Sequence, residues 1–332
     1  MLEIALYSSI KVIVVVVAIL TGCAYATYME RKVVAIMQHR IGPSYAGPWG
    51  LLQPLADAIK MAFKEDIVPD NVERITYALA PILAFIPSLL SFAVVPFSAD
   101  FSLVGREITG VISDLNIGIL WIFAVTSLGV YGIILAGWSS GSKYSLLGGI
   151  RSSAQMISYE ISYGLSIVGV ILIANTLSMR ELVEQQGTIL DWYVWKQPLG
   201  FLLYLICAIA ETNRAPFDLP EAESELVAGY HTEYSSFRFG MFFVGEYANM
   251  LAVSAVGTTL FFGGWQAPWG AFPAQLSIIW FLIKVFLFMF FYIWLRATFP
   301  RFRYDQLMDF GWKILFPLAV LNVLVTGAIV LF

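Results

Sequence analysis

The sequence predicts an all-α integral membrane protein with about eight transmembrane helices and an interfacial amphipathic helix on the cytoplasmic side. Of the 332 residues, 59% are hydrophobic and only 13% are charged, against about 25% charged residues in ordinary soluble domains. Uncharged runs long enough to cross a bilayer recur along the chain. Because no linker, low-complexity segment or internal repeat separates these runs, we expect one transmembrane domain over residues 1–332.

The uncharged runs define the predicted spans in order. Five of them cover residues 12–29, 75–99, 115–142, 161–179 and 314–332. A shorter run at 197–210 ends at Glu211 and predicts a short fifth span. The uncharged stretch from Tyr247 to Ile283 is divided by the turn-rich segment 263–273 into a sixth and a seventh span, and Lys284 interrupts the seventh. An even number of spans places both termini on the same side.

Lysines and arginines predict the orientation, because they concentrate on the cytoplasmic side of membrane proteins. Fourteen lie in the connections after spans one, three, five and seven, or at the same edge: Arg31, Lys32, Arg40, Lys60, Lys64, Arg74, Lys143, Arg151, Arg214, Arg238, Arg296, Arg301, Arg303 and Lys313. The four on the opposite side are Lys11, Arg106, Arg180 and Lys196. These connections are therefore expected to face the cytoplasm, or the matrix of a mitochondrion.

The composition also excludes several classes of function. A net charge of −4 gives no reason to expect nucleic acid as a partner. Cys23 and Cys207 lie in apolar runs without metal-ligand spacing, so we expect buried hydrophobic residues rather than ligands. The sequence has no GxGxxG motif, Walker loop or metal-ligand cluster. We therefore expect no redox centre, metal or cofactor on this chain, and electrons would come from a partner.

The first cytoplasmic connection predicts an amphipathic helix over residues 51–65. Its apolar stripe and its charged stripe consist of Leu52, Leu55, Ile59 and Phe63, and of Asp57, Lys60 and Lys64, respectively. Such a helix lies in the plane of the membrane interface. It is either a peripheral anchor or a lip over an opening into the helix bundle.

Two acids are predicted to lie inside the membrane. Glu160 is nine residues past Arg151 and Glu246 is eight residues past Arg238, which places them about 14 Å and about 12 Å along their helices. Because a charge at such depth costs roughly 2.5–3.5 kcal/mol, intramembrane acids usually face the bundle interior and mark proton paths. A structural ion pair, for instance with Lys284, is the alternative.

An acid-rich hinge over residues 211–238 follows the short fifth span. Its carboxylates are Glu211, Asp218, Glu221, Glu223, Glu225 and Glu233, and Arg214 is the single base before Arg238. Pro216 and Pro220 break the helix around Phe217. Neighbouring carboxylates raise each other's proton affinity, so together with the two intramembrane acids they predict a line of proton-exchanging groups. Arg214 is expected to pair with one of its neighbouring acids. A solvated acidic loop is the alternative.

Four segments resemble one family of membrane subunits, the H-type subunits of NADH:quinone oxidoreductase (respiratory complex I), and the resemblance covers nearly the whole chain. They are "ERK…QHRIGPSYAGPWGLLQPLADAIKMAFKEDIVP", "SYEIS", "AETNRAPFDLPEAESELVAGYHTEYSSFRFGMFFVGEYANM" and "RATFPRFRYDQLMDFGWK". The resemblance implies a component of a proton-translocating enzyme complex. Quinone, the substrate, would enter from the bilayer between the first span, the sixth span and the amphipathic helix, and an iron–sulfur cluster of a partner would reduce it.

The resemblance also assigns roles to residues. Arg31, Arg40, Asp57 and Lys60 would lie at the quinone entrance, and Arg214, Phe217 and Asp218 at the chamber wall. Glu160, Glu211, Glu221, Glu223, Glu225 and Glu246 would relay protons. The implied partners are hydrophilic subunits that carry FMN and iron–sulfur clusters, small neighbouring membrane subunits, and lipid. The implied location is the bacterial inner membrane, with the mitochondrial inner membrane as the alternative.

Two other classes of function remain open on the sequence. Broken helices and intramembrane acids also occur in stand-alone secondary transporters and ion channels, although the chain shows no internal repeat. Related subunits occur in membrane-bound hydrogenases and in the ferredoxin-linked photosynthetic complex. The electron-input partner that co-purifies with the chain would distinguish these alternatives.

Overall fold

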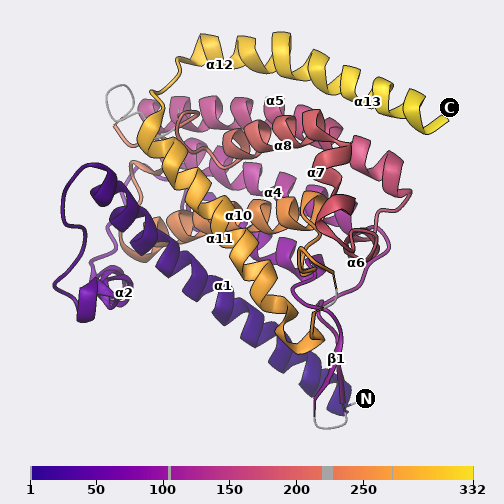
Figure 1. Cartoon of the computed structure of the whole chain (residues 1–332). Coiled ribbons are helices and arrows are strands. Elements are labelled where there is room, and N and C mark those ends of the chain that lie inside the picture. The colour runs from indigo at the N-terminus through magenta and orange to yellow at the C-terminus, as the bar shows by residue number, and fades with distance from the viewer. Residues whose placement is uncertain (1, 104–105, 219–226, 271, 332) are drawn as a thin grey trace.

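Long apolar helices dominate the computed structural model, which describes residues 2–103, 106–218, 227–270 and 272–331 (Figure 1). Within these ranges seven helices can span a membrane: α1 (Leu2–Met37), α3 (Arg74–Leu90), α4 (Gly118–Ser139), α5 (Lys143–Ala174), α10 (Ser236–Phe261), α11 (Ser277–Thr298) and α13 (Phe316–Leu331). An eighth span is formed if the bent pair α7 (Tyr193–Lys196) and α8 (Pro198–Glu211) is counted as one. The prediction of an all-α, multi-pass membrane protein is confirmed.

Short elements connect the spans. They are α2 (Gln53–Phe63), α6 (Met179–Glu184), α12 (Tyr304–Phe310), 3-10 turns at Pro48–Gly50, Ser91–Val94, Ile189–Asp191, Gly229–His231 and Ala274–Leu276, and a π-helical turn at Gly311–Leu315. Strands β1 (Phe101–Leu103) and β2 (Arg106–Ile108) pair antiparallel. Both chain ends and β1 lie at one end of the bundle, whereas α2 and the start of α12 lie at the other (Figure 1).

The centre of the bundle is α5, which packs against α4, α8 and α13, while α10 packs against α1, α3 and α11. Tyr159 on α5 and Tyr204 on α8 are fully buried. Small residues allow the helices to approach closely, as is usual in membrane bundles. A Cβ at Gly132 on α4, for example, would lie only 2.5 Å from the backbone nitrogen of Ala84 on α3.

Two predicted spans differ from the observed helices. The fourth was expected at 161–179, but α5 begins at Lys143 and contains Glu160 well inside it. Hydropathy misses this first half because its polar residues, such as the fully buried Ser152 and Gln155, face other helices instead of lipid. The seventh span was expected to be interrupted by Lys284, yet α11 continues through it.

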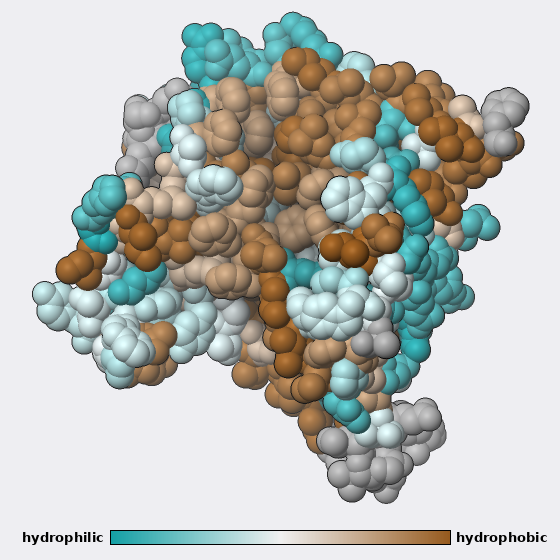
Figure 2. All heavy atoms as spheres, in the orientation of Figure 1, coloured by the Kyte–Doolittle hydropathy of each residue, from teal (hydrophilic) through white to brown (hydrophobic). Residues whose placement is uncertain are grey.

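The predicted amphipathic helix is present as α2, slightly shorter than expected. Its apolar side chains point away from the bundle, since Leu55, Ile59 and Phe63 are 58%, 50% and 88% exposed. Its other face is attached to the bundle, because the Ser236 hydroxyl at the start of α10 donates to the Met61 and Lys64 carbonyls. Figure 2 shows apolar side chains over much of the bundle surface, with hydrophilic residues mainly at the margins.

Candidate functional site

A buried cluster of charges centres on Arg214, in the segment that follows α8. Arg214 is 6% exposed. Its Nε lies 2.7 Å from Glu246 Oε1 on α10, and its Nη1 lies 3.6 Å from Glu30 Oε2 on α1. The guanidinium also lies 4.3 Å from the ring centroid of Tyr247, a favourable cation–π distance.

Glu30 joins three helices to this cluster. It accepts a hydrogen bond of 2.5 Å from the Tyr247 hydroxyl and forms an ion pair with Arg296 on α11. The two acids Glu30 and Glu246 are therefore balanced by the two bases Arg214 and Arg296. Buried charges are tolerated when they are paired and hydrogen-bonded in this way. Sequence reasoning assigned no site role to Glu30, Tyr247 or Arg296, because no local pattern connects three residues so far apart in the chain.

The predicted pairing of Arg214 with a neighbouring acid of the hinge stays a prediction, because three of these acids lie outside the described residues. Among the described residues, Arg214 pairs with Glu30 and Glu246, which belong to distant helices. The Arg214 amide donates to the Ile209 carbonyl, where the chain turns after α8. The predicted relay residues Glu221, Glu223 and Glu225 lie outside the described residues.

Phe217 and Asp218 are held by the connection between α11 and α12. The Phe217 ring stacks on Phe302, with centroids 5.6 Å apart and planes 18° apart, and also packs against Tyr159, with centroids 5.8 Å apart. Arg301 lies 3.1 Å from the Asp218 carboxylate, which is buried. These contacts hold residues 217 and 218, which end the first described part of the hinge, against the bundle.

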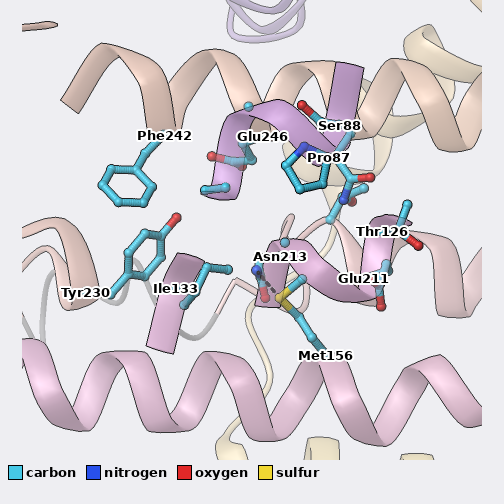
Figure 3. Close-up of a pocket in the computed structure, with 15 residues that line it drawn as sticks. Pro87, Ser88, Thr126, Ile133, Met156, Glu211, Asn213, Tyr230, Phe242 and Glu246 are labelled. Carbon is cyan, nitrogen blue, oxygen red and sulfur yellow. Dashed lines mark hydrogen bonds between the residues drawn. The ribbon is translucent and has the colours of Figure 1, made fainter. Parts of the chain in front are cut away.

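A cavity of about 50 Å³ connects two of the predicted relay acids (Figure 3). Glu246 and Glu211 both line it, and Asn213, whose amide donates to the Met156 sulfur, lies between them. Its wall carries acidic, amide and hydroxyl side chains among apolar ones, so a cavity of this size offers partners for ordered water.

Glu160 lies beyond Glu211, on α5. Its carboxylate accepts a hydrogen bond from the Ser127 hydroxyl on α4, and it interacts electrostatically with Glu211. The predicted acids Glu246, Glu211 and Glu160 thus follow one another through the bundle, even though the first is 86 residues from the last in the sequence.

The four predicted entrance residues are only partly brought together. Arg31 on α1 lies 2.7 Å from Asp57 on α2. Arg31 and Arg40 also line a polar hollow of about 580 Å³, together with Glu30 and Arg296 of the charged cluster. Lys60 is exposed and forms no ion pair with any other described residue.

A separate apolar groove of about 700 Å³ lies along the same two helices. Residues of α1 and α11 form its walls, and Leu251 of α10 contributes to it. Between Tyr28 and Ala35 of α1, residues that line the groove alternate with residues that line the hollow, and none lines both, so the two are formed by different faces of the helix. An apolar groove and a polar hollow therefore lie beside the same stretch of α1.

Lys284 on α11 has a different environment from the one expected. Its ammonium group donates to the carbonyls of Phe262, Gly264 and Gln266 at 2.6–2.9 Å and lies 4.7 Å from the ring centroid of Trp192. In the part of the chain that the structure describes, it forms no pair with an acid. Lys284 therefore caps the backbone that follows α10.

The fold and these features define a multi-pass helical membrane protein with a paired charge cluster buried near one face of the bundle. The chain belongs to the NADH dehydrogenase family, whose model matches residues 10–327. Similar relatives are H-type subunits of NADH-quinone oxidoreductase. Those of Geobacter metallireducens, Koribacter versatilis and Protochlamydia amoebophila are 51%, 52% and 53% identical, covering 97%, 98% and 92% of this chain and 94%, 97% and 92% of their own. The resemblance inferred from the sequence is confirmed.

Proposed function

We propose that the chain is the membrane component of a proton-translocating NADH:quinone oxidoreductase that admits quinone from the bilayer and forms part of its chamber. Membership of the NADH dehydrogenase family and the names of the relatives support this assignment. The chain would act with hydrophilic subunits that hold FMN and iron–sulfur clusters and with small membrane subunits. Its proposed location is the bacterial inner membrane.

The observation that supports this function best is that an apolar groove and a polar hollow are both lined by residues of α1 and α11. A quinone combines a long isoprenoid tail with a polar head group, so its path needs both environments. The groove between α1 and α11 suits the tail. The hollow offers the Arg31 and Arg40 guanidinium groups as hydrogen-bond donors to the head group. The α2 helix, with its outward apolar stripe, would border the entrance at the membrane surface.

The charge cluster provides a means of coupling. Quinone reduction takes up protons as well as electrons, so it changes the charge balance next to Glu30 and Arg214. A change at Glu30 alters how strongly Arg214 is attracted to Glu246, because the guanidinium is shared between the two carboxylates. Glu246 would then exchange protons through the cavity with Glu211 and onward to Glu160. The Glu221, Glu223 and Glu225 carboxylates would extend this relay toward the chamber.

Purification of the tagged chain from native membranes tests the assignment. We expect iron–sulfur proteins and NADH:quinone reductase activity to co-purify with it, and a photoreactive quinone to label residues 22–43 of this chain. A stand-alone transporter or channel would be isolated without redox proteins. A hydrogenase or a ferredoxin-linked protein as the electron-input partner would assign the chain to a different complex.

A further inference from the structure

Gln155 on α5 connects two points of the backbone that are seven residues apart. Its side chain is fully buried. Its amide nitrogen donates to the Ala210 carbonyl at 2.9 Å and to the Phe217 carbonyl at 2.8 Å. One side-chain amide therefore holds both ends of the segment 211–217.

This segment is held partly by its own backbone, since the Phe217 amide donates to the Arg214 carbonyl at 2.9 Å and the Thr212 amide donates to the Ala208 carbonyl at 3.2 Å, but the bonds in its middle are longer. The Asn213 amide is 3.3 Å from the Ala210 carbonyl, and the Arg214 amide is 3.4 Å from the Ile209 carbonyl. Both distances lie beyond the usual range of 2.7–3.2 Å. Gln155 therefore adds two bonds of ordinary length, one at each end of a segment whose middle is weakly bonded.

The segment held in this way contains residues of the proposed coupling path. Glu211 lines the cavity, and Arg214 lies between Glu30 and Glu246. Two further residues of α5 face the same segment, since the Met156 sulfur accepts from Asn213 and the Tyr159 ring packs on Phe217. Glu160 follows directly on α5, so a single rigid helix relates the position of Glu160 to that of Glu211.

We infer that Gln155 is a positioning residue for the coupled reaction. It takes no part in proton transfer; by fixing the carbonyls of Ala210 and Phe217 it sets the place of Glu211 relative to Glu160 and that of Arg214 relative to Glu246. The inference rests on the proposed function, because it concerns how that function is coupled.

The chain contains a matched control at the other end of the bundle. Gln186 is also fully buried, and its amide nitrogen also donates to two carbonyls, those of Leu182 and Thr259, each at 3.0 Å. Its oxygen accepts from the backbone amides of Tyr193 and Gly263. Replacing Gln186 removes the same two donated hydrogen bonds and two accepted ones as well, at a site away from Glu160, Glu211 and Glu246.

The test compares Gln155→Met with Gln186→Met in the whole complex. Methionine keeps the length of the side chain but donates no hydrogen bond. For Gln155→Met we expect kcat for quinone reduction per assembled complex to fall on the order of tenfold to a hundredfold, as a small misplacement of reacting groups can cause. Electron transfer from NADH to an artificial acceptor should be unchanged. For Gln186→Met we expect less assembled complex but normal kcat.

Gln155→Glu gives a second readout that a merely structural role would not produce. The ionised carboxylate has no donor and repels both carbonyls, whereas its protonated form donates one hydrogen bond. We expect the ratio of variant to wild-type turnover to rise as the pH is lowered. A ratio that is independent of pH, with kcat of Gln155→Met equal to that of Gln186→Met, would overturn the inference.

Hydrogen exchange of the backbone amides separates the inference from the proposed function. Exchange in residues 209–217 should be faster in Gln155→Met than in wild type and unchanged in Gln186→Met. Unchanged exchange in both variants would refute the positioning role, whatever the activity. If wild-type complex had no quinone reductase activity, the proposed function would fail, while the exchange result would still decide whether Gln155 holds the segment. If Gln155→Met does not assemble, the same exchange and pH measurements on Gln155→Glu decide the question.

Discussion

Arg214 and Lys284 are two buried bases of the same bundle, and their partners differ in kind. Arg214 lies between two carboxylates, Glu246 at 2.7 Å and Glu30 at 3.6 Å, which belong to different helices. Lys284 lies among three backbone carbonyls at 2.6–2.9 Å. Each is also placed over an aromatic ring, Tyr247 for Arg214 and Trp192 for Lys284.

The kind of partner decides whether the environment of a buried base can change during a reaction. A carboxylate can take up a proton or change its partner, so the environment of Arg214 can change during a reaction. A backbone carbonyl keeps its dipole under all conditions, so the environment of Lys284 is fixed. Lys284 also complements the negative end of the α10 dipole, near Phe262. The Arg214 end of the bundle is therefore suited to coupling, and the Lys284 end to holding the helices in place.

Replacing Arg214 should have the largest effect. Arg214→Met leaves Glu30 and Glu246 without the guanidinium between them, and breaking a buried ion pair costs about 3–5 kcal/mol. We expect quinone reductase activity to fall by more than about a hundredfold and assembly to be impaired. Arg214→Lys is the matched control, because it keeps the charge but loses the two-pronged contact. It should assemble normally and still lose turnover; full activity of Arg214→Lys would contradict the shared-guanidinium account.

Replacing Lys284 should weaken the complex without slowing it. Lys284→Met leaves three buried carbonyls without their donor, and each unsatisfied group costs about 1–3 kcal/mol before the loop relaxes. We expect a net loss of roughly 3 kcal/mol, seen as a lower temperature at which the complex dissociates. Turnover per assembled complex should remain normal. A drop in kcat at full assembly would show that the two bases do not differ as proposed.

Neutralising the intramembrane acids should have a smaller effect. Glu246→Gln and Glu160→Gln keep the shape of the side chain but cannot carry charge. We expect quinone turnover and proton pumping to fall together by about tenfold, within the range of typical coupling free energies. Electron transfer from NADH to an artificial acceptor should be normal. Proton-to-electron stoichiometry in reconstituted vesicles is the measurement, and wild-type values for both variants would remove these acids from the relay.

The smallest effect is expected at the edge of the entrance. The pair between Arg31 and Asp57 is partly exposed, with 49% and 29% of the side chains accessible, and such pairs contribute only about 0.2–1 kcal/mol. Asp57→Ala should raise KM for quinone by roughly twofold to threefold and leave kcat unchanged. Lys60→Ala, which removes an exposed base without an ion pair among the described residues, is the control and should do less. Equal changes in KM would mean that the attachment of α2 to α1 does not matter.

Sequence reasoning succeeded where the signal is local. Apolar runs placed the spans. The hydrocarbon core of a bilayer has a set thickness, and a helix that crosses it must satisfy its own backbone groups and be apolar over that length. The apolar and charged stripes around Asp57 predicted α2, because they repeat with the period of a helix. It failed where a helix is polar but buried against protein, as in the first half of α5, since hydropathy does not distinguish a neighbouring helix from water.

What the sequence alone determined is therefore the class of protein and most of the helices long and apolar enough to cross a membrane. The tertiary structure decided the partners of the buried charges. Glu30 and Arg296 are 266 residues apart, and no local pattern marks them as a pair. The hydrogen bonds from Gln155 to both ends of the segment 211–217 likewise cannot be predicted from the sequence. The physical reason is that burial leaves a charge or an amide no water to bind, so its partner is whichever group the packed helices bring within reach.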